Sequence, residues 1–189
     1  MEVKFKPKIF IHSLLSDDLL SRLEKNFDID HHDTIKSILS GNELLDRVKN
    51  VEGILVQSAL IDKTLIEACP NLKVICNVGV GFDNIDANFC TKMGIQVTNT
   101  PGILNDAVAD MSMALLLAVA RRVPEGDRIV RSGGFKSNFY HLLWGADLRG
   151  ENLGIIGMGS IGQDVAKRAI PFGLNIKYHN RNRLSKNSE

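Results

Sequence analysis

Three glycines with the spacing G-x-G-x-x-G, at Gly157, Gly159 and Gly162, constrain the fold of this chain more than any other feature. The apolar run that ends at Ile156 is typical of a buried strand, and the residues after the third glycine keep the spacing of a helix with one apolar face. A second strand-like run follows over residues 174–181. A strand, a tight turn, a helix and a second strand form one right-handed unit of a parallel sheet, so this segment predicts an α/β fold.

Each glycine of such a unit has its own physical task. Gly157 would make the tight turn, Gly159 would let backbone approach a pyrophosphate, and Gly162 would let the helix pack closely on the strand. The N–H groups of Ser160, Ile161 and Gly162 would face phosphates at the positive end of the helix. The pattern therefore predicts a dinucleotide site, and the alternative is a plain tight turn between strand and helix.

The residues that close the second strand indicate which nucleotide this site prefers. A carboxylate at this place accepts hydrogen bonds from the ribose 2′-OH and repels a 2′-phosphate. The chain instead carries Asn180, Arg181, Asn182 and Arg183. Arg is a natural partner of phosphate because it combines charge with a planar fork of donors. We therefore expect these residues to favour NADP(H) over NAD(H), and the alternative is a solvated basic loop.

The first hundred residues alternate between strand-like and helical runs. The strand-like runs are residues 8–13, 27–32, 51–58, 72–79 and 94–100. The helical runs are residues 16–26, with Ser16 as the expected N-cap, 61–70 and 84–94. Strands that alternate with helices predict a parallel sheet with crossover helices, in a domain that covers residues 1–100.

A boundary follows at residues 100–102, where Pro and Gly stop the last strand. A long helix is predicted over residues 105–122, and it is apolar nearly all round, so more than one neighbour must cover it. Pro124 can open a second, shorter helix that ends near Arg131. A loop then leads to the glycine-rich unit, and residues 101–189 form the second predicted domain.

Composition argues against several other classes of partner. The chain is 44% hydrophobic with a net charge of +1 and no basic stripe, which argues against nucleic acid or an anionic membrane as the main partner. The most apolar stretch, residues 113–120, is too short to span a bilayer, and no secretory signal is visible. Cys69, Cys76 and Cys90 lack zinc-ligand spacing, so we expect reduced thiols of a cytoplasmic protein and no metal site.

Three motifs resemble, in sequence and order, those of the D-isomer-specific 2-hydroxyacid dehydrogenases. They are VGVGFDNIDANFCTKMGIQVTNTPG at 78–102, VADMSMALLLAVARR at 108–122 and LGIIGMGSIG at 153–162. The glyoxylate/hydroxypyruvate reductase branch is the most similar. The resemblance implies a flavodoxin-like substrate domain followed by a Rossmann dinucleotide-binding domain that is incomplete at its C-terminal end. It also implies an oxidoreductase that uses NADPH to reduce a small 2-oxo acid, such as glyoxylate or hydroxypyruvate, to the D-2-hydroxy acid.

The resemblance gives a role to the loop that begins at Val78. In the family, backbone N–H groups of this loop hold the substrate carboxylate, which implies that Val78, Gly79 and Val80 are the substrate contacts. Glycines after a strand do leave amides open to an anion, and the alternative is that they only permit a turn. The resemblance further implies a homodimer that forms through the helix at residues 105–122.

The catalytic Arg, Glu and His of the family lie beyond the matched motifs, and no residue of this sequence corresponds to them. The histidines of the chain are His12, His31, His32, His141 and His179. None has a Glu partner at a readable spacing, so we expect all of them to be structural or solvated and assign no catalytic residue. We therefore expect a chain truncated before its catalysts. The alternatives are a non-catalytic dinucleotide-sensing or partner-binding protein and an inactive fragment.

Overall fold

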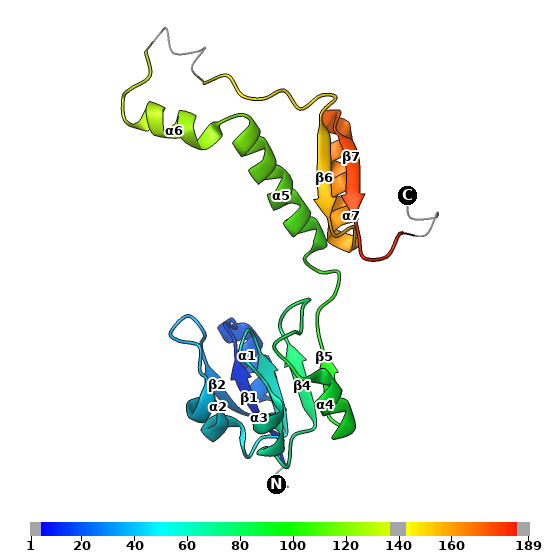
Figure 1. The fold of residues 1–189 in the computed structure, drawn as a ribbon. Helices are drawn as coiled ribbons and strands as arrows, with labels where there is room; N and C mark the ends of the chain where they lie inside the picture. Colours follow the sequence, from blue (N-terminus) through cyan, green and yellow to red (C-terminus); the bar gives the residue numbers. More distant parts are fainter. Residues whose placement is uncertain (1–4, 137–142, 185–189) are drawn as a thin grey trace. The chain divides into compact units, whose positions relative to one another are not determined.

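The structure, a computed structural model, describes residues 5–136 and 143–184. The chain divides into two units, Met1–Pro101 and Gly102–Glu189, and each is described by itself (Figure 1). The division falls between Pro101 and Gly102, where the left-handed backbone of Gly102 (φ +82°) suits glycine.

The first unit is built on a five-stranded parallel sheet. Its strands are β1 (Lys8–His12), β2 (Asp28–His32), β3 (Gly53–Val56), β4 (Val74–Asn77) and β5 (Gln96–Thr98). Their order in the sheet is β2-β1-β3-β4-β5, which is the flavodoxin-like order. The predicted α/β fold with a parallel sheet is therefore confirmed. Because all strands are parallel, their carboxyl ends lie at the same edge of the sheet.

The helices of this unit are α1 (Asp17–Glu24), α2 (Gly41–Val48), α3 (Lys63–Glu67) and α4 (Ala87–Lys92). Ser16 caps α1 as predicted, because its Oγ accepts a hydrogen bond from the Leu19 N–H at 3.4 Å. The sequence did not predict α2, which has no side-chain cap and begins at Gly41 with a left-handed backbone (φ +54°). Burial of Leu44 and Val48 holds this helix on the sheet, so tertiary packing replaces the missing start signal.

The core of the first unit lies between the sheet and its helices. Its most buried members are Phe10, Ile54, Val56 and Ile75 from the strands, and Leu44, Val48, Ile66 and Cys90 from the helices. Each such side chain stabilises the fold by roughly 1.5–3 kcal/mol relative to an exposed position. Burial also raises the pKa of the Cys69 thiol to about 11, and raises that of Cys90, so both behave as apolar side chains.

The second unit contains α5 (Asn105–Ala120), α6 (Val123–Arg131), β6 (Asn152–Ile156), α7 (Ser160–Ala169), the short 3₁₀ helix η2 (Ile170–Phe172) and β7 (Asn175–His179). β6 and β7 form a parallel two-stranded sheet, and α7 connects them. α5 packs against α7 through a small core around Met113 and Ala169. Arg168 of α7 joins the two helices at their surface, with ion pairs to Asp106 and Asp110.

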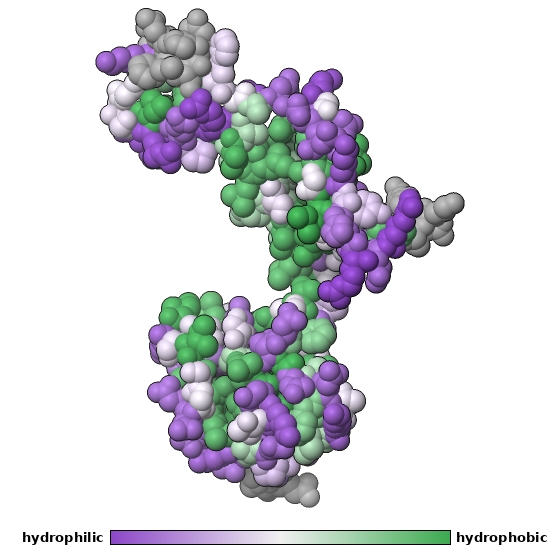
Figure 2. Space-filling model, in the orientation of Figure 1, coloured by the Kyte–Doolittle hydropathy of each residue, from purple (hydrophilic) through white to green (hydrophobic). Residues whose placement is uncertain are grey.

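The opposite side of α5 is apolar and exposed within the described residues. Its side chains Val108, Met111, Leu115 and Val119 are 40%, 60%, 59% and 76% exposed. Figure 2 shows hydrophobic residues gathered along this helix. Among the described residues of the second unit, the neighbours of α5 therefore leave this side of the helix exposed. No helix among the described residues is long and apolar enough to cross a membrane.

Candidate functional site

A hollow of about 370 Å³ opens at the carboxyl ends of β3 and β4. Its lining residues come from the ends of these strands and the loops after them: Gln57, Ser58, Asn77, Val78, Gly79, Gly81, Asp83 and Asn84. In open parallel α/β sheets, ligands bind at this edge. Two of the predicted substrate contacts, Val78 and Gly79, line the hollow, whereas Val80 does not.

The loop after β4 carries backbone donors without acceptors. The Val78 N–H donates to the Val56 carbonyl oxygen at 2.8 Å. This N–H, which was expected to contact the substrate, is therefore already bonded within the protein. The N–H groups of Gly79, Val80 and Gly81 have no acceptor within the part of the chain that the structure describes. Three consecutive open N–H groups at the carboxyl edge of a sheet can bind an anion.

The two glycines of this loop are not required by the loop's own geometry. Neither Gly79 nor Gly81 has a positive φ. A Cβ added at Gly79 would lie 3.4 Å from the Asn77 Nδ2, and one at Gly81 would lie 3.7 Å from the Asp83 Oδ2, which are ordinary contact distances. A tight turn therefore does not explain these glycines, and the loop leaves its backbone accessible at both positions.

Ser58 is a lining residue that the sequence did not reveal. It follows β3 and has a positive φ of 66°, which is uncommon outside glycine and is concentrated at functional sites. No sequence pattern marks this position, because Ser is common in turns of ordinary geometry.

The buried ring of His12, at the end of β1, holds a neighbouring loop in place. Its Nε2 accepts a hydrogen bond from the Leu39 N–H at 3.0 Å, and its ring stacks on that of His32 with 5.5 Å between centroids. Burial lowers the pKa of His12, and the charge of His32 lowers it further, while nearby backbone carbonyl groups oppose this shift. His12 is therefore neutral near neutral pH and acts as a hydrogen-bond acceptor.

The other described histidines also contact backbone or lie at the surface. The Nε2 of His31 lies 3.0 Å from the Ser13 carbonyl oxygen, and the Nε2 of His32 lies 3.0 Å from that of Ser37. His179 is exposed at the end of β7, and His141 lies outside the described residues. Within residues 5–136 and 143–184, no group of three or more His, Cys, Asp or Glu could hold a metal ion.

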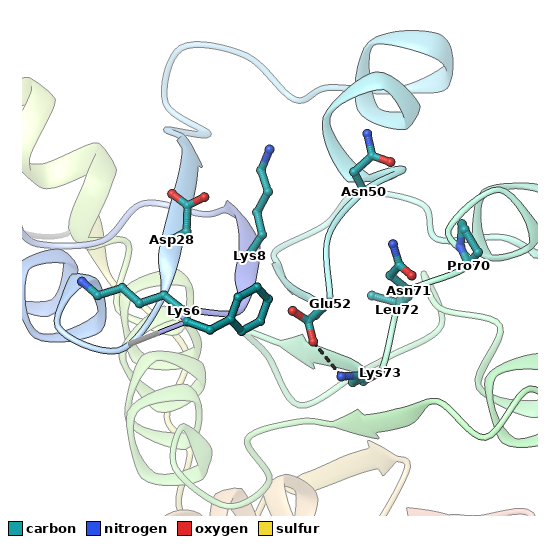
Figure 3. Close-up of a pocket in the computed structure, with 10 residues that line it drawn as sticks. Lys6, Lys8, Asp28, Asn50, Glu52, Pro70, Asn71, Leu72 and Lys73 are labelled. Atoms are coloured by element: carbon teal, nitrogen blue, oxygen red, sulfur yellow. Dashed lines mark hydrogen bonds and ion pairs between the residues drawn. The ribbon is translucent and has the colours of Figure 1, made fainter. Parts of the chain in front are cut away.

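A larger hollow, of about 690 Å³, lies where β1 and β2 begin (Figure 3). Figure 3 shows lysines and carboxylates around it, and Lys73 pairs with Glu52 at 2.6 Å. It lies at the amino ends of the strands, opposite the edge where ligands bind in such sheets. Its mixed charge also favours no single ligand, so this hollow is not the candidate functional site.

In the second unit, the three glycines of the turn between β6 and α7 differ in backbone conformation and in the space around them. Gly157 has a φ of +95°, and its N–H donates to the His179 carbonyl oxygen at 2.9 Å. A Cβ at Gly162 would lie 2.3 Å from the Gly157 carbonyl oxygen, so close packing of helix on strand requires glycine there. Gly159 has an ordinary φ of −78°, and a Cβ there would meet no atom within 4 Å. Neither a positive φ nor a steric clash requires glycine at Gly159, so the space beside it is open to a ligand.

The start of α7 presents unpaired donors to this space. The first hydrogen bond of the helix runs from the Gln163 N–H to the Gly159 carbonyl at 2.9 Å. No side chain caps this end, so the N–H groups of Ser160, Ile161 and Gly162 have no acceptor among the described residues. Such a helix end combines free donors with a positive partial charge and binds phosphate groups.

The residues predicted to select the nucleotide follow β7 directly. The hydrogen bond between Gly157 and His179 brings the end of β7 beside the glycine turn. Asn180 is half-buried there, and Arg181, Asn182 and Arg183 are exposed. The structure thus brings this basic segment and the start of α7 to the same end of the two-stranded sheet.

Comparison with known proteins gives a consistent result. The family model for the D-isomer specific 2-hydroxyacid dehydrogenase catalytic domain matches residues 9–169. Glyoxylate reductase of Thermococcus litoralis is 44% identical over 183 residues, which cover 94% of this chain and 55% of the relative. Glyoxylate reductase of Pyrococcus horikoshii is also 44% identical, over 94% of this chain and 54% of that protein.

Solved structures show the same similarity. A protein from Thermus thermophilus superposes with a TM-score of 0.86 at 41% identity, over 94% of this chain and 57% of that one. The NADPH-dependent glyoxylate/hydroxypyruvate reductase of Sinorhizobium meliloti, solved with NADP and malonate, has a TM-score of 0.77 at 31% identity. That match covers 96% of this chain and 56% of the other. The chain thus spans about half the length of the curated relatives it matches.

Proposed function

This chain belongs to the D-isomer specific 2-hydroxyacid dehydrogenase family, and on that premise we propose that it binds both reactants of an NADPH-dependent reduction. The substrate is a small 2-oxo acid of the glyoxylate or hydroxypyruvate class, and the product is the D-2-hydroxy acid. The first unit is the substrate domain, and the second unit is the dinucleotide-binding domain. The observation that carries the proposal is the open space at Gly159, which lies beside the free N–H groups at the start of α7 and leaves room for a ligand.

The first unit holds the substrate by its carboxylate. The N–H groups of Gly79 and Val80 donate to the carboxylate oxygens, and hydrogen bonds to a charged acceptor are worth about 1.5–3 kcal/mol each. Val78 contributes its side chain, which is 38% exposed, because its N–H is bonded to Val56. The hollow that these residues line accommodates a small acid rather than a long chain.

The second unit holds the nucleotide by its phosphates. The N–H groups at the start of α7 face the pyrophosphate in the space above Gly159. Asn180 and Asn182 can bond the ribose, while Arg181 and Arg183 neutralise a 2′-phosphate. When bound, the reduced nicotinamide supplies the hydride that reduces the 2-oxo carbon. We assign no proton donor in this chain, because the histidines described at the sheet edge are bonded to backbone groups.

We further propose that α5 pairs with α5 of a second copy. Its exposed apolar side chains lie on the side away from α7, and a two-fold axis would let the same stripe cover itself. The buried free thiols Cys69 and Cys90 support a reducing compartment, which we propose to be the cytoplasm.

Nucleotide titration of the purified chain tests the cofactor proposal. We expect NADPH to bind more tightly than NADH, and Arg181→Ala to weaken NADPH binding by about 1–3 kcal/mol with little change for NADH. Lys177→Ala is the matched control, because it removes one exposed positive charge from β7, before the segment assigned to the nucleotide. Equal losses for both nucleotides in Arg181→Ala, or an equal loss in the control, would contradict the proposal.

A chimera tests the activity. The part of this chain that matches the Thermococcus litoralis glyoxylate reductase, 94% of its length, replaces the matching segment of that protein, which supplies the remainder. We expect the chimera to reduce glyoxylate or hydroxypyruvate with NADPH, measured by loss of nucleotide absorbance. A soluble chimera that binds NADPH yet reduces neither acid would favour a dinucleotide-sensing role instead.

A further inference from the structure

In the loop after β4, the carbonyl groups of Gly79, Val80 and Gly81 accept hydrogen bonds from other parts of the protein. The Gly79 carbonyl accepts a hydrogen bond from the Thr100 N–H at 2.9 Å. The Val80 carbonyl accepts one from the Asn99 Nδ2 at 2.8 Å, and the Gly81 carbonyl accepts one from the Asn77 Nδ2 at 2.6 Å. Three successive acceptors are therefore satisfied from the strand ends, while the donors of the same loop are open.

Two of these bonds fix the direction of the open N–H groups of Val80 and Gly81. In a trans peptide the carbonyl of one residue and the N–H of the next point in opposite directions. Binding the Val80 carbonyl to Asn99 therefore turns the Gly81 N–H outward. The Thr100 bond to Gly79 does the same for the Val80 N–H.

We propose that Asn77 and Asn99 are positioning residues for the substrate carboxylate. They act through the loop: Asn99 holds the Val80 carbonyl oxygen away from the anion and so presents the Gly81 N–H to it, and Asn77 holds the Gly81 carbonyl oxygen away from it. The same geometry adds the N–H of Gly81 to the contacts already assigned to Gly79 and Val80. This inference rests on the proposed function, since it assumes that the loop binds a carboxylate.

The burial of the two asparagines supports this role. Asn77 is only 5% exposed, and Asn99 is half-buried at the end of β5, next to β4. A peptide group that loses its partner can rotate, and its carbonyl oxygen would then point at the carboxylate and repel it. Loss of either amide should therefore weaken anion binding more than it disturbs the core.

The test is a titration of the ¹⁵N-labelled chain with oxamate, a stable analogue of a 2-oxo acid, followed by amide chemical shifts. In the wild type, the amides of Val80 and Gly81 should shift saturably. Asn99→Ala and Asn77→Ala should weaken this binding by about 3- to 10-fold. Thr91→Ala is the matched control, because it also removes a side-chain bond to a carbonyl, the 2.9 Å contact with Ala87 in α4, and it should leave the affinity unchanged.

Two further readouts separate positioning from a merely structural role. The amides of Ile54 and Ile75 report the core, and they should keep their wild-type shifts in Asn99→Ala. If the more buried Asn77→Ala fails to fold, Asn99→Ala alone decides the question. Methyl pyruvate, which lacks the charge, should shift none of the loop amides, and equal shifts with it would overturn the inference.

The outcomes distinguish this inference from the function on which it rests. If oxamate shifts no loop amide in the wild type, both the proposed carboxylate-binding site and the inference are wrong. If oxamate shifts Val80 and Gly81 with the same affinity in the wild type and in Asn99→Ala, the positioning role is wrong while the proposed substrate contact stands.

Discussion

Alanine at each glycine of the turn before α7 should separate glycines that the fold requires from the one that a ligand requires. At Gly162 the new Cβ would lie 2.3 Å from a backbone oxygen, against a floor of 3.0 Å for real Cβ contacts, a deficit of about 0.7 Å. At Gly157 the space is open but φ is +95°. At Gly159 the space is open and φ is −78°, so alanine is accepted without strain.

The expected magnitudes follow from these geometries. Gly162→Ala overpacks backbone against backbone, which costs about 3 kcal/mol, the upper end of the usual range, and the helix preference for alanine offsets about 1 kcal/mol. Gly157→Ala costs about 1–2 kcal/mol because an L-residue is held in a left-handed conformation. Gly159→Ala should change the stability of the second unit by less than about 1 kcal/mol, because the restriction of the unfolded chain by alanine is opposed by the poor fit of alanine at the N-cap of α7. The same methyl occupies the pyrophosphate space and should weaken NADPH binding about 10-fold or more.

Two measurements on the same samples decide this prediction. Amide hydrogen exchange at Ile155 and Val165 reports the local stability of the second unit, which a single melting temperature of a two-unit chain would not. Nucleotide fluorescence reports NADPH affinity. The reasoning fails if Gly159→Ala binds NADPH as tightly as the wild type. It also fails if Gly162→Ala exchanges as slowly as the wild type, because the steric argument would then be wrong.

Three further predictions concern the rest of the molecule. Burial lowers the pKa of His12 in the folded chain, so the unfolded chain binds more protons as the pH falls. The contribution of neutral His12 to the free energy of unfolding is therefore full above about pH 6.5 and is lost as the pH falls below that value. Denaturant unfolding across this range should show this loss of stability in the wild type and not in His12→Gln. Leu115→Lys on the exposed side of α5 should abolish self-association measured by light scattering, whereas Val130→Lys on α6, at a similarly exposed apolar position, should not. Buried Cys69 and Cys90 should resist a thiol reagent in the folded chain and react when urea unfolds it; rapid reaction of either in native buffer would contradict their assignment as inert core residues.

The sequence predicted most strands and helices because each carries a local signal. Apolar runs bounded by Gly, Pro or Asn gave the strands, and the Ser16 cap and glycine pattern gave the starts of α1 and α7. The signal failed at α2, where Ser40 makes no cap bond and Gly41 adopts a left-handed backbone. Only the burial of Leu44 and Val48 in the finished fold explains that helix, and such contacts cannot be read from local sequence.

The candidate substrate site was predictable only in part. The loop that begins at Val78 was found through its resemblance to a family, but its local sequence does not show that the Val78 N–H is already bonded to Val56. Asn99 contacts this loop from 19 residues away in sequence, and the strained backbone of Ser58 follows from the way β3 ends. These features depend on which strands become neighbours, so they appear only once the sheet order is known.

Across the two candidate sites, some glycines are required by the fold and others are not. Gly157 and Gly162 are needed by the chain itself, through a positive φ and through close packing. Gly79, Gly81 and Gly159 have no positive φ, and a Cβ at each would meet no atom closer than 3.4 Å, so neither strain nor sterics requires glycine there. Glycine in such places raises the entropy of the unfolded chain, which lowers the stability of the fold. We infer that glycine at these positions lets an anion approach the backbone closely. The anion is a carboxylate in the first unit and a pyrophosphate in the second.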